Sequence, residues 1–309
     1  MDALAVILEA PEQLSLRSLA LNEPTATDIV VDIAWSGIST GTERLLWSGK
    51  MPEFPGMGYP LVPGYESVGR VVDAGAEARG RIGEWVFVPG ANCYRHARGL
   101  FGGSASRVVM PGARAVPVAE SLGANGVLVA LAATAYHAIA GHSAPDLIVG
   151  HGVLGRLLAR IAVATGAPAP TVWETNAARA EGVRGYAVVH PDADDRRDYK
   201  AIYDASGDGT LLDSLIARLA RGGEVVLAGF YERLSFTFPP AFMREARLRI
   251  AAEFLPSDLE AVTGMVASGA LSLDDLVTHT QPAADAADAY PQAFSDPACL
   301  KMVLDWNSL

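Results

Sequence analysis

The stretch Asp146-Leu-Ile-Val-Gly-His-Gly-Val-Leu-Gly155 decides the fold of the second half of the chain. Its apolar start predicts a short strand, and Arg156–Gly166 has the apolar periodicity of a helix. The glycines between them form G-x-G-x-x-G at the junction of strand and helix, where a phosphate-binding turn requires them. Gly150 allows a tight turn, Gly152 lets backbone approach a pyrophosphate, and Gly155 lets helix and strand pack closely. The alternative is a Gly-rich turn without a ligand.

The same pattern predicts where the rest of a dinucleotide would bind. The helix that opens at Val153 and Leu154 supplies free N–H groups and positive partial charge for phosphates. Glu174 ends the next expected strand, 24 positions after Gly150. A carboxylate there can bind both ribose hydroxyls and repel a 2′-phosphate, which favours NAD. Arg179 keeps NADP open, and a solvated strand end is the alternative interpretation of Glu174.

Strands and helices alternate through the second half of the chain. This alternation predicts an α/β fold with a Rossmann doubly wound parallel sheet. The first ~120 residues instead have short apolar runs separated by Gly and Pro, which is typical of β-rich structure. The expected strands of the parallel sheet are 146–150, 170–174, 186–190, 200–207, 224–230 and 248–254, with a helix over 210–223.

Composition excludes several classes of protein. The 309 residues carry a net charge of −11, which argues against binding nucleic acid or an anionic membrane surface. Cys93 and Cys299 are the only cysteines, so a disulfide framework is absent and a reducing cytoplasm fits. The N-terminus has no basic start of a signal peptide. The apolar part of Ser121–Pro145 is shorter than the roughly 20 residues of a membrane span, so we expect a buried helix there.

Nearly the whole chain resembles the medium-chain dehydrogenase/reductase superfamily. The resemblance implies a GroES-like β-rich catalytic domain over 1–125, a Rossmann domain over 126–255 and a C-terminal return to the catalytic domain over 256–309. It also implies a homodimer through the last Rossmann strand. The stretches that carry it are GISTGTE (37–43), PGYESVG (63–69), VVDAG (71–75), the fingerprint at Gly150, YDASG (203–207) and VTGMVASGALSLDDLVTH (262–279).

The metal positions of the zinc members are altered in this chain. By the resemblance, the first ligand position holds Ser39 or Thr40, the second holds Tyr65, and the third falls near Ala130. None of these is a normal zinc ligand. The structural zinc lobe is reduced to the lone Cys93. We therefore expect no metal site.

An alcohol dehydrogenase without a metal needs other groups to bind the substrate oxygen and to take its proton. Thr42 matches the family position that begins the proton relay. Ser39, Thr40 and Tyr65 stand at the vacated metal positions, and Glu66 is the adjacent carboxylate. As alternatives, the hydroxyls could bond their own turn, Tyr65 could pack in the interior, and Glu66 could bind an arginine or backbone.

Within the superfamily, SGISTGTERLLWSGKMPEFPGMGYPLVPGYESVG (36–69) and GANCYRHARGLFGGSASRVV (90–109) most resemble the bacteriochlorophyllide dehydrogenases. That resemblance implies NAD-dependent oxidation of the 3-(1-hydroxyethyl) group of a tetrapyrrole to 3-acetyl. Trp47, Phe54 and Tyr59 would face the macrocycle, and Arg95 a propionate; packing or a solvated loop are the alternatives. A metal-free NAD(P)H-dependent enone or quinone reductase is the rival enzyme class, and a non-catalytic dinucleotide-binding regulator is a third interpretation.

Overall fold

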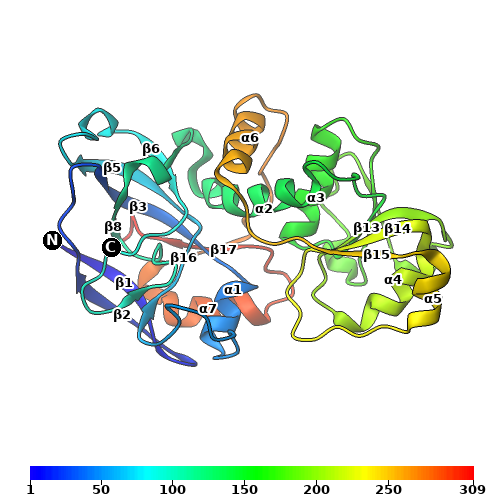
Figure 1. The fold of residues 1–309 in the computed structure, drawn as a ribbon. Helices are drawn as coiled ribbons and strands as arrows, with labels where there is room; N and C mark the ends of the chain where they lie inside the picture. Colours follow the sequence, from blue (N-terminus) through cyan, green and yellow to red (C-terminus); the bar gives the residue numbers. More distant parts are fainter. The chain divides into compact units, whose positions relative to one another are not determined.

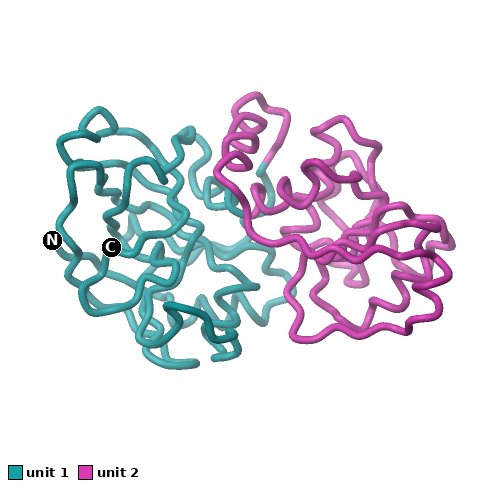
Figure 2. Tube along the Cα trace, in the orientation of Figure 1, with its two compact units in different colours: residues 1–130, 273–309 teal, residues 131–272 magenta.

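The computed structural model describes residues 1–309 (Figure 1). The chain forms two compact units: unit 1 holds residues 1–130 and 273–309, and unit 2 holds residues 131–272 (Figure 2). The sequence placed the boundaries at 125/126 and 255/256. The later second boundary puts α6 (Pro256–Ala267) in unit 2. Asp258 of this helix accepts a 2.8 Å hydrogen bond from Nδ1 of His137, within the same unit.

Unit 1 contains two β-sheets. The smaller sheet has the order β2-β1-β4-β7. In the larger one, β16-β17-β3-β5-β6-β9, strand β8 also pairs with β3. The C-terminal strand lies antiparallel to β3, with Val303 opposite Gly37, so the chain end returns to the first part of the unit. The strands are β1 (Asp2–Ala10), β2 (Gln13–Ala20), β3 (Asp28–Ile38), β4 (Leu61–Val62), β5 (Ser67–Ala74), β6 (Trp85–Val88), β7 (Arg98–Gly99), β8 (Arg107–Pro111), β9 (Val116–Pro117), β16 (His279–Pro282) and β17 (Met302–Asp305).

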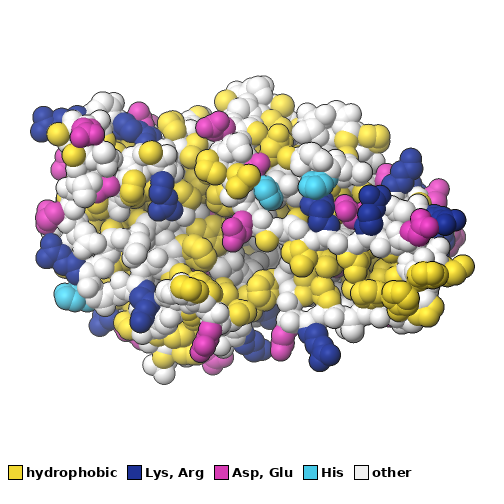
Figure 3. Space-filling view, in the orientation of Figure 1, with side chains coloured by type: hydrophobic (Ala, Val, Ile, Leu, Met, Phe, Trp, Pro, Cys, Tyr) yellow, Lys and Arg dark blue, Asp and Glu magenta, His cyan; other side chains and the backbone are white.

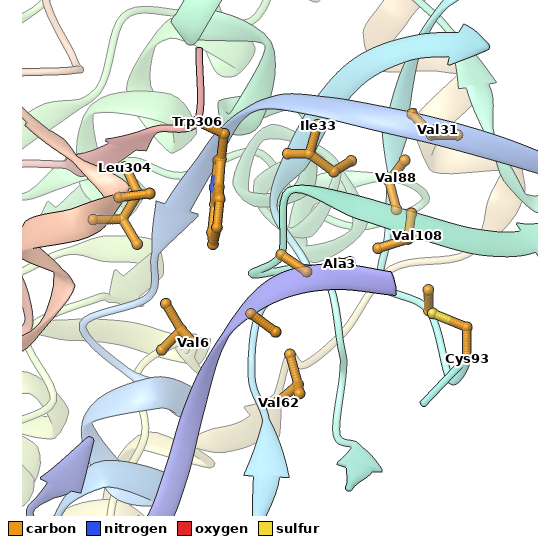
Figure 4. Packing of buried hydrophobic residues seen from close by; sticks show 14 of the residues in the cluster. Ala3, Val6, Val31, Ile33, Val62, Val88, Cys93, Val108, Leu304 and Trp306 are labelled. Atoms are coloured by element: carbon orange, nitrogen blue, oxygen red, sulfur yellow. The ribbon is translucent and has the colours of Figure 1, made fainter. Parts of the chain in front are cut away.

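The core of unit 1 brings together strands that are distant in the sequence. Val31 and Ile33 of β3 are buried with Val108 of β8 and with Leu304 and Trp306 at the C-terminal end (Figure 4). Buried aliphatic and aromatic surface is the main stabilising contribution to such a unit. The returning C-terminal segment is therefore part of the core of unit 1.

Unit 2 is built on a six-stranded parallel sheet, as the alternation of elements predicted. Its order is β12-β11-β10-β13-β14-β15, so the chain changes direction across the sheet between β10 and β13. Ligands of such folds bind at the carboxyl ends of the strands at this switch point. The strands are β10 (Leu147–Val149), β11 (Thr171–Trp173), β12 (Ala187–Val189), β13 (Tyr199–Asp204), β14 (Leu219–Leu227) and β15 (Arg247–Ile250).

The helices show where local patterns mislead. The helix expected over 210–223 is α4 (Leu212–Arg218), because Leu219 already begins β14. Gly222 has a left-handed φ of +72°, which a continuing helix does not allow. The remaining α-helices are α1 (Thr42–Trp47), α2 (Val129–Ile139), α3 (Val153–Ala164), α5 (Phe238–Arg244) and α7 (Ala286–Ser295).

One helical stretch, Glu120–Ile139, is long and apolar enough to cross a membrane by length and composition alone. It consists of the 3₁₀ segment η3 (Glu120–Leu128) followed by α2. Just over half of its most apolar window is buried inside the fold, and the core helix of a protein meets the same test. The helix expected within Ser121–Pro145 is present.

Candidate active site

The glycine turn has the geometry that a phosphate-binding turn requires. Gly150 follows β10 with a φ of +95°, a conformation that favours glycine. A Cβ on Gly155 would lie 1.9 Å from the carbonyl oxygen of Gly150, so only glycine fits there. A Cβ on Gly152 would meet nothing within 4 Å, so the backbone is open on that side. Val153 and Leu154 begin α3, where the first N–H groups have no partner within the helix.

Glu174 lies beside this turn, directly after β11. Its Oε2 accepts a 3.1 Å hydrogen bond from the backbone N–H of His151, and its Oε1 accepts one of 2.8 Å from Asn176. The structure thus brings Glu174 and the glycine turn together at the carboxyl edge of the sheet. An open glycine backbone, a helix start and an adjacent carboxylate fit the pyrophosphate and ribose of a dinucleotide.

Three of the predicted hydroxyl groups gather in unit 1, at the end of β3 and the start of α1. Ser39 is buried, and its Oγ lies 2.9 Å from the phenolic oxygen of Tyr65. The backbone N–H of Thr42 donates to the same Oγ at 3.3 Å. Thr40 is exposed at the surface. Of the four hydroxyl residues proposed from the sequence, Ser39, Thr42 and Tyr65 lie together, whereas Thr40 is exposed and lies outside this cluster.

Tyr65 is held in its protonated form. Burial raises the pKa of its phenol well above the ordinary value and the charge of Glu66 raises it further, while hydrogen bonds with Ser39 and Thr42 lower it. Its ring meets Phe101 edge-on, with ring centres 5.3 Å apart. A phenol that keeps its proton can donate a hydrogen bond, but it does not act as a base.

Glu66 has a cationic partner that the sequence did not suggest. Its carboxylate is fully buried and forms an ion pair with Lys301, which is also buried. The Lys301 ammonium also donates to the carbonyl of Ile38 at 3.0 Å. Glycine at position 37 provides the space for this carboxylate, since a Cβ there would lie 2.6 Å from Oε2 of Glu66. The ion pair agrees with the alternative interpretation that Glu66 has a structural role, although its cation is a lysine and not the expected arginine.

Glu43 is a second buried carboxyl group in this region. Tyr290 donates a 2.6 Å hydrogen bond to its Oε2, and the backbone N–H of Ser39 donates to its Oε1 at 3.4 Å. Burial raises the pKa of Glu43 to about 8; Tyr290 lowers it and the charge of Glu66 raises it. Sequence reasoning missed Tyr290 and Lys301. The only available signal was a lysine inside the apolar strand-like run Leu300–Trp306.

The residues at the former metal positions do not fit a zinc ion. Ser39 and Tyr65 bond each other through neutral hydroxyls, and Ala130 has no donor atom. The described chain, residues 1–309, contains no group of three or more His, Cys, Asp or Glu that could hold a metal ion. Cys93 is buried, and burial raises the pKa of its thiol, which disfavours the thiolate that a metal would require.

The four residues that the sequence suggested for substrate binding have different surroundings in the structure. Trp47 and Tyr59 pack on a small buried cluster of Leu8, Leu46 and Leu61, whereas Phe54 is exposed. Arg95 lies on the surface, where its Nε donates to Leu21 O at 3.0 Å and its guanidinium pairs with Glu23 at 3.5 Å. The cation beside Tyr59 is Arg98, whose Nη1 donates to the Tyr59 carbonyl at 3.2 Å.

Comparison of the chain with known proteins shows the family to which it belongs. Residues 25–120 match the alcohol dehydrogenase GroES-like domain. The chain is 58% identical over 316 aligned residues to the 2-desacetyl-2-hydroxyethyl bacteriochlorophyllide A dehydrogenase of Cereibacter sphaeroides, covering 100% of this chain and 99% of the relative. Two solved structures share the fold. An Escherichia coli alcohol dehydrogenase complexed with NADH is 20% identical, with a TM-score of 0.83 and coverage of 98% and 99%. A Sinorhizobium meliloti dehydrogenase bound to NADP is 23% identical, with a TM-score of 0.81 and 99% coverage of both chains.

The fold and the glycine turn define an oxidoreductase of the medium-chain alcohol dehydrogenase class, with a Rossmann sheet and a GroES-like unit. The predicted fold class and the predicted superfamily are confirmed. More narrowly, the chain belongs to the family of the 2-desacetyl-2-hydroxyethyl bacteriochlorophyllide A dehydrogenases.

Proposed function

We propose that this enzyme oxidises the 3-(1-hydroxyethyl) side chain of a bacteriochlorophyllide to the 3-acetyl group, with NAD as hydride acceptor and without a catalytic metal. The identity of 58% over the whole chain to a dehydrogenase named for this type of substrate carries the proposal. The alcohol carbon is attached to a conjugated macrocycle. Positive charge that develops at this carbon as hydride leaves is therefore delocalised, which is a chemical reason why a metal is dispensable.

The preference for NAD rests on Glu174. Its carboxylate lies between the backbone N–H groups of His151 and Asn176, at the end of the strand next to the glycine turn. A ribose 2′-hydroxyl can donate to such a carboxylate, whereas a 2′-phosphate is repelled by it. We infer that residues 131–272 bind the dinucleotide and that residues 1–130 with 273–309 bind the alcohol.

The nicotinamide of the bound dinucleotide supplies the hydride acceptor. We assign the alcohol oxygen to the hydroxyls of Ser39, Thr42 and Tyr65. Tyr65 stays protonated and donates a hydrogen bond to the oxygen as negative charge develops on it. Thr42 is our first choice for passing the alcohol proton toward solvent, because it begins α1 and is only half-buried.

Substrate binding is assigned to the loop after α1. Trp47, Phe54 and Tyr59 provide apolar and aromatic area for a flat macrocycle. Arg95 is our candidate for a propionate carboxylate, in exchange for its partner Glu23. Replacing Trp47 with Ala is expected to raise the macrocycle KM several-fold and leave NAD binding unchanged.

The direct test is a reaction in vitro. The purified enzyme is incubated with 3-(1-hydroxyethyl)bacteriochlorophyllide and NAD, and NADH formation is followed together with the red shift of the pigment absorption. We expect both signals in equal molar amounts, and unchanged rates after treatment with a strong chelator. Turnover of an enone or quinone with NADPH, without turnover of the alcohol, would replace the proposal by the rival reductase. Stoichiometric zinc on which activity depends would refute the metal-free mechanism.

We also propose a homodimer through β15, the last strand of the parallel sheet. This strand has a neighbour on one side only, and Ile250 at its end is 77% exposed. The adjacent α5 also exposes the apolar side chains of Phe238, Phe242 and Met243. Figure 3 shows hydrophobic side chains gathered in the region of this helix. An edge strand beside an apolar surface is suited to pairing with a second copy. Ile250→Asp is expected to yield monomers by sedimentation; an unchanged mass would refute the assignment.

We also propose that the protein works in a reducing cytoplasm, because this compartment suits its two buried thiols.

A further inference from the structure

Arg156 occupies an unusual place in the phosphate-binding region. It lies in the first turn of α3, one residue after the last glycine of the turn, and its side chain is buried, with 4% of the residue exposed. The start of a helix carries positive partial charge, which disfavours a cation. Burial of an ion also costs several kcal/mol unless the surroundings compensate for it. The position of Arg156 therefore needs compensating partners.

Those partners are four backbone carbonyls in two separate segments. Nε of Arg156 donates to the carbonyl of His151, within the glycine turn, at 3.1 Å. Nη2 donates to Arg179 at 2.9 Å and to Glu181 at 2.8 Å, and Nη1 donates to Gly182 at 3.2 Å. Gly182 has a φ of +75°, and a Cβ there would lie 2.5 Å from Nη1. The guanidinium thus joins the glycine turn to the segment that follows Glu174.

His151 makes a second connection between the same segments. Its ring is buried, with Nδ1 2.5 Å from the carbonyl of Arg179 and Nε2 2.8 Å from the hydroxyl of Tyr186. A carbonyl only accepts, so Nδ1 carries the proton and Nε2 accepts from Tyr186. Burial lowers the pKa of His151 to about 4, so the ring keeps this neutral form at working pH. The carbonyl of Arg179 is therefore held by both side chains.

Glu174 depends on the register of these two segments. One of its carboxylate oxygens binds the N–H of His151 in the glycine turn, and the other binds Asn176, at the start of the second segment. A shift of one segment against the other would break one of these bonds and turn the carboxylate. We propose that Arg156 and His151 are positioning residues that hold segment 176–186 against the glycine turn, and thereby set cofactor affinity and the preference for NAD over NADP. This rests on the cofactor half of the proposed function only.

The test is direct titration with NADH and NADPH, followed by the fluorescence of the reduced nicotinamide, so no alcohol substrate is needed. Arg156→Met removes the donors and keeps an unbranched apolar chain in place of the aliphatic part of the arginine. We expect the Kd for NADH to rise at least about fivefold, because an affinity falls in proportion to the fraction of protein with the binding segment in place. The ratio of the Kd values for NADPH and NADH should fall. Tyr186→Phe removes one bond and should give a smaller rise.

Arg218 provides a matched control. Its guanidinium also donates to backbone carbonyls, those of Asp194, Arg196 and Pro191. It directly precedes β14 and so lies at the amino edge of the parallel sheet, whereas Glu174 follows the carboxyl end of β11. Arg218→Met should leave the Kd for NADH within about twofold, provided that the effect of Arg156 is local rather than a general loss of folding.

Hydrogen–deuterium exchange provides the second readout. In Arg156→Met, residues 176–186 should exchange faster while those of β13 stay protected. A rise in Kd below fivefold, an equal rise in the Arg218 variant, or unchanged exchange in 176–186 would each overturn the inference. If Arg156→Met does not fold, Arg156→Lys replaces it under the same criteria. A wild-type protein that binds neither NADH nor NADPH would refute the proposed cofactor, and the inference with it.

Discussion

The buried carboxyl group of Glu43 makes a quantitative prediction about stability. Burial raises its pKa from an ordinary 4.5 to about 8, so the folded state binds this proton more tightly than the unfolded chain does. Each tenfold change in proton affinity is worth about 1.4 kcal/mol, which gives a maximum of roughly 5 kcal/mol for this group. The stabilising contribution of the proton is complete below about pH 4.5 and is lost as the pH rises toward 8.

The perturbation is Glu43→Gln, which is neutral at every pH. Between about pH 5.5 and about pH 8 the wild type should lose roughly 3 kcal/mol of unfolding free energy that the variant retains. The assay is urea unfolding followed by tryptophan fluorescence, because four of the five tryptophans lie in unit 1 with Glu43: Trp35, Trp47, Trp85 and Trp306. Glu23→Gln, an exposed carboxylate in the same unit, is the control. Equal pH dependence in the wild type and in Glu43→Gln would refute the reasoning.

Three further substitutions test other parts of the structure. Lys301→Met leaves the buried Glu66 without its cation, and we expect the unfolding free energy to fall by about 3–5 kcal/mol, measured by urea unfolding. Gly155→Ala places a methyl group 1.9 Å from the carbonyl of Gly150 and should abolish NADH binding in a fluorescence titration, whereas unaltered affinity would contradict the turn geometry. Glu174→Gln removes the charge that repels a 2′-phosphate, so the kcat/KM for NADP should rise about tenfold or more relative to NAD; an unchanged ratio would show that other groups decide the preference.

The parts of the fold that could be predicted are those with a local signal. The glycine turn, the strands of the parallel sheet and the helix after the turn are each encoded within about ten neighbouring residues. The helix over 210–223 was predicted too long, because the residues from Leu219 to Gly223 have no side-chain pattern that separates a helix end from a strand start. The helix α5 was missed, because it begins Phe238-Pro-Pro and is too short to show helical periodicity.

Prediction of the site was likewise limited to residues with a local sequence signal. Ser39, Thr42 and Tyr65 could be proposed because each stands in a recognisable motif. The partners of the two neighbouring carboxyl groups lie far away in sequence: Lys301 is 235 positions from Glu66, and Tyr290 is 247 from Glu43. No spacing rule connects such residues: Tyr290 lies on α7, and Lys301 directly precedes the C-terminal strand, which pairs with β3. For the same reason the sequence showed Arg156 only as one member of an apolar helix.

The buried charged groups next to the cluster of Ser39, Thr42 and Tyr65 also lead to a prediction of how the reaction rate depends on pH. Glu43 and Glu66 are two buried carboxyl groups with one ammonium, that of Lys301, so the set is neutral only while Glu43 keeps its proton. A carboxyl group in such surroundings neutralises instead of remaining charged. When Glu43 ionises near pH 8, its new negative charge lies next to Ser39. In the mechanism that we propose, this charge opposes the negative charge that develops on the substrate oxygen. We therefore expect the kcat of Glu43→Gln, relative to wild type, to rise as the pH passes 8, with the ratio constant below about pH 7. A ratio that stays flat to pH 9.5 in stopped-flow measurements of NADH formation would show that this charge does not reach the reacting oxygen.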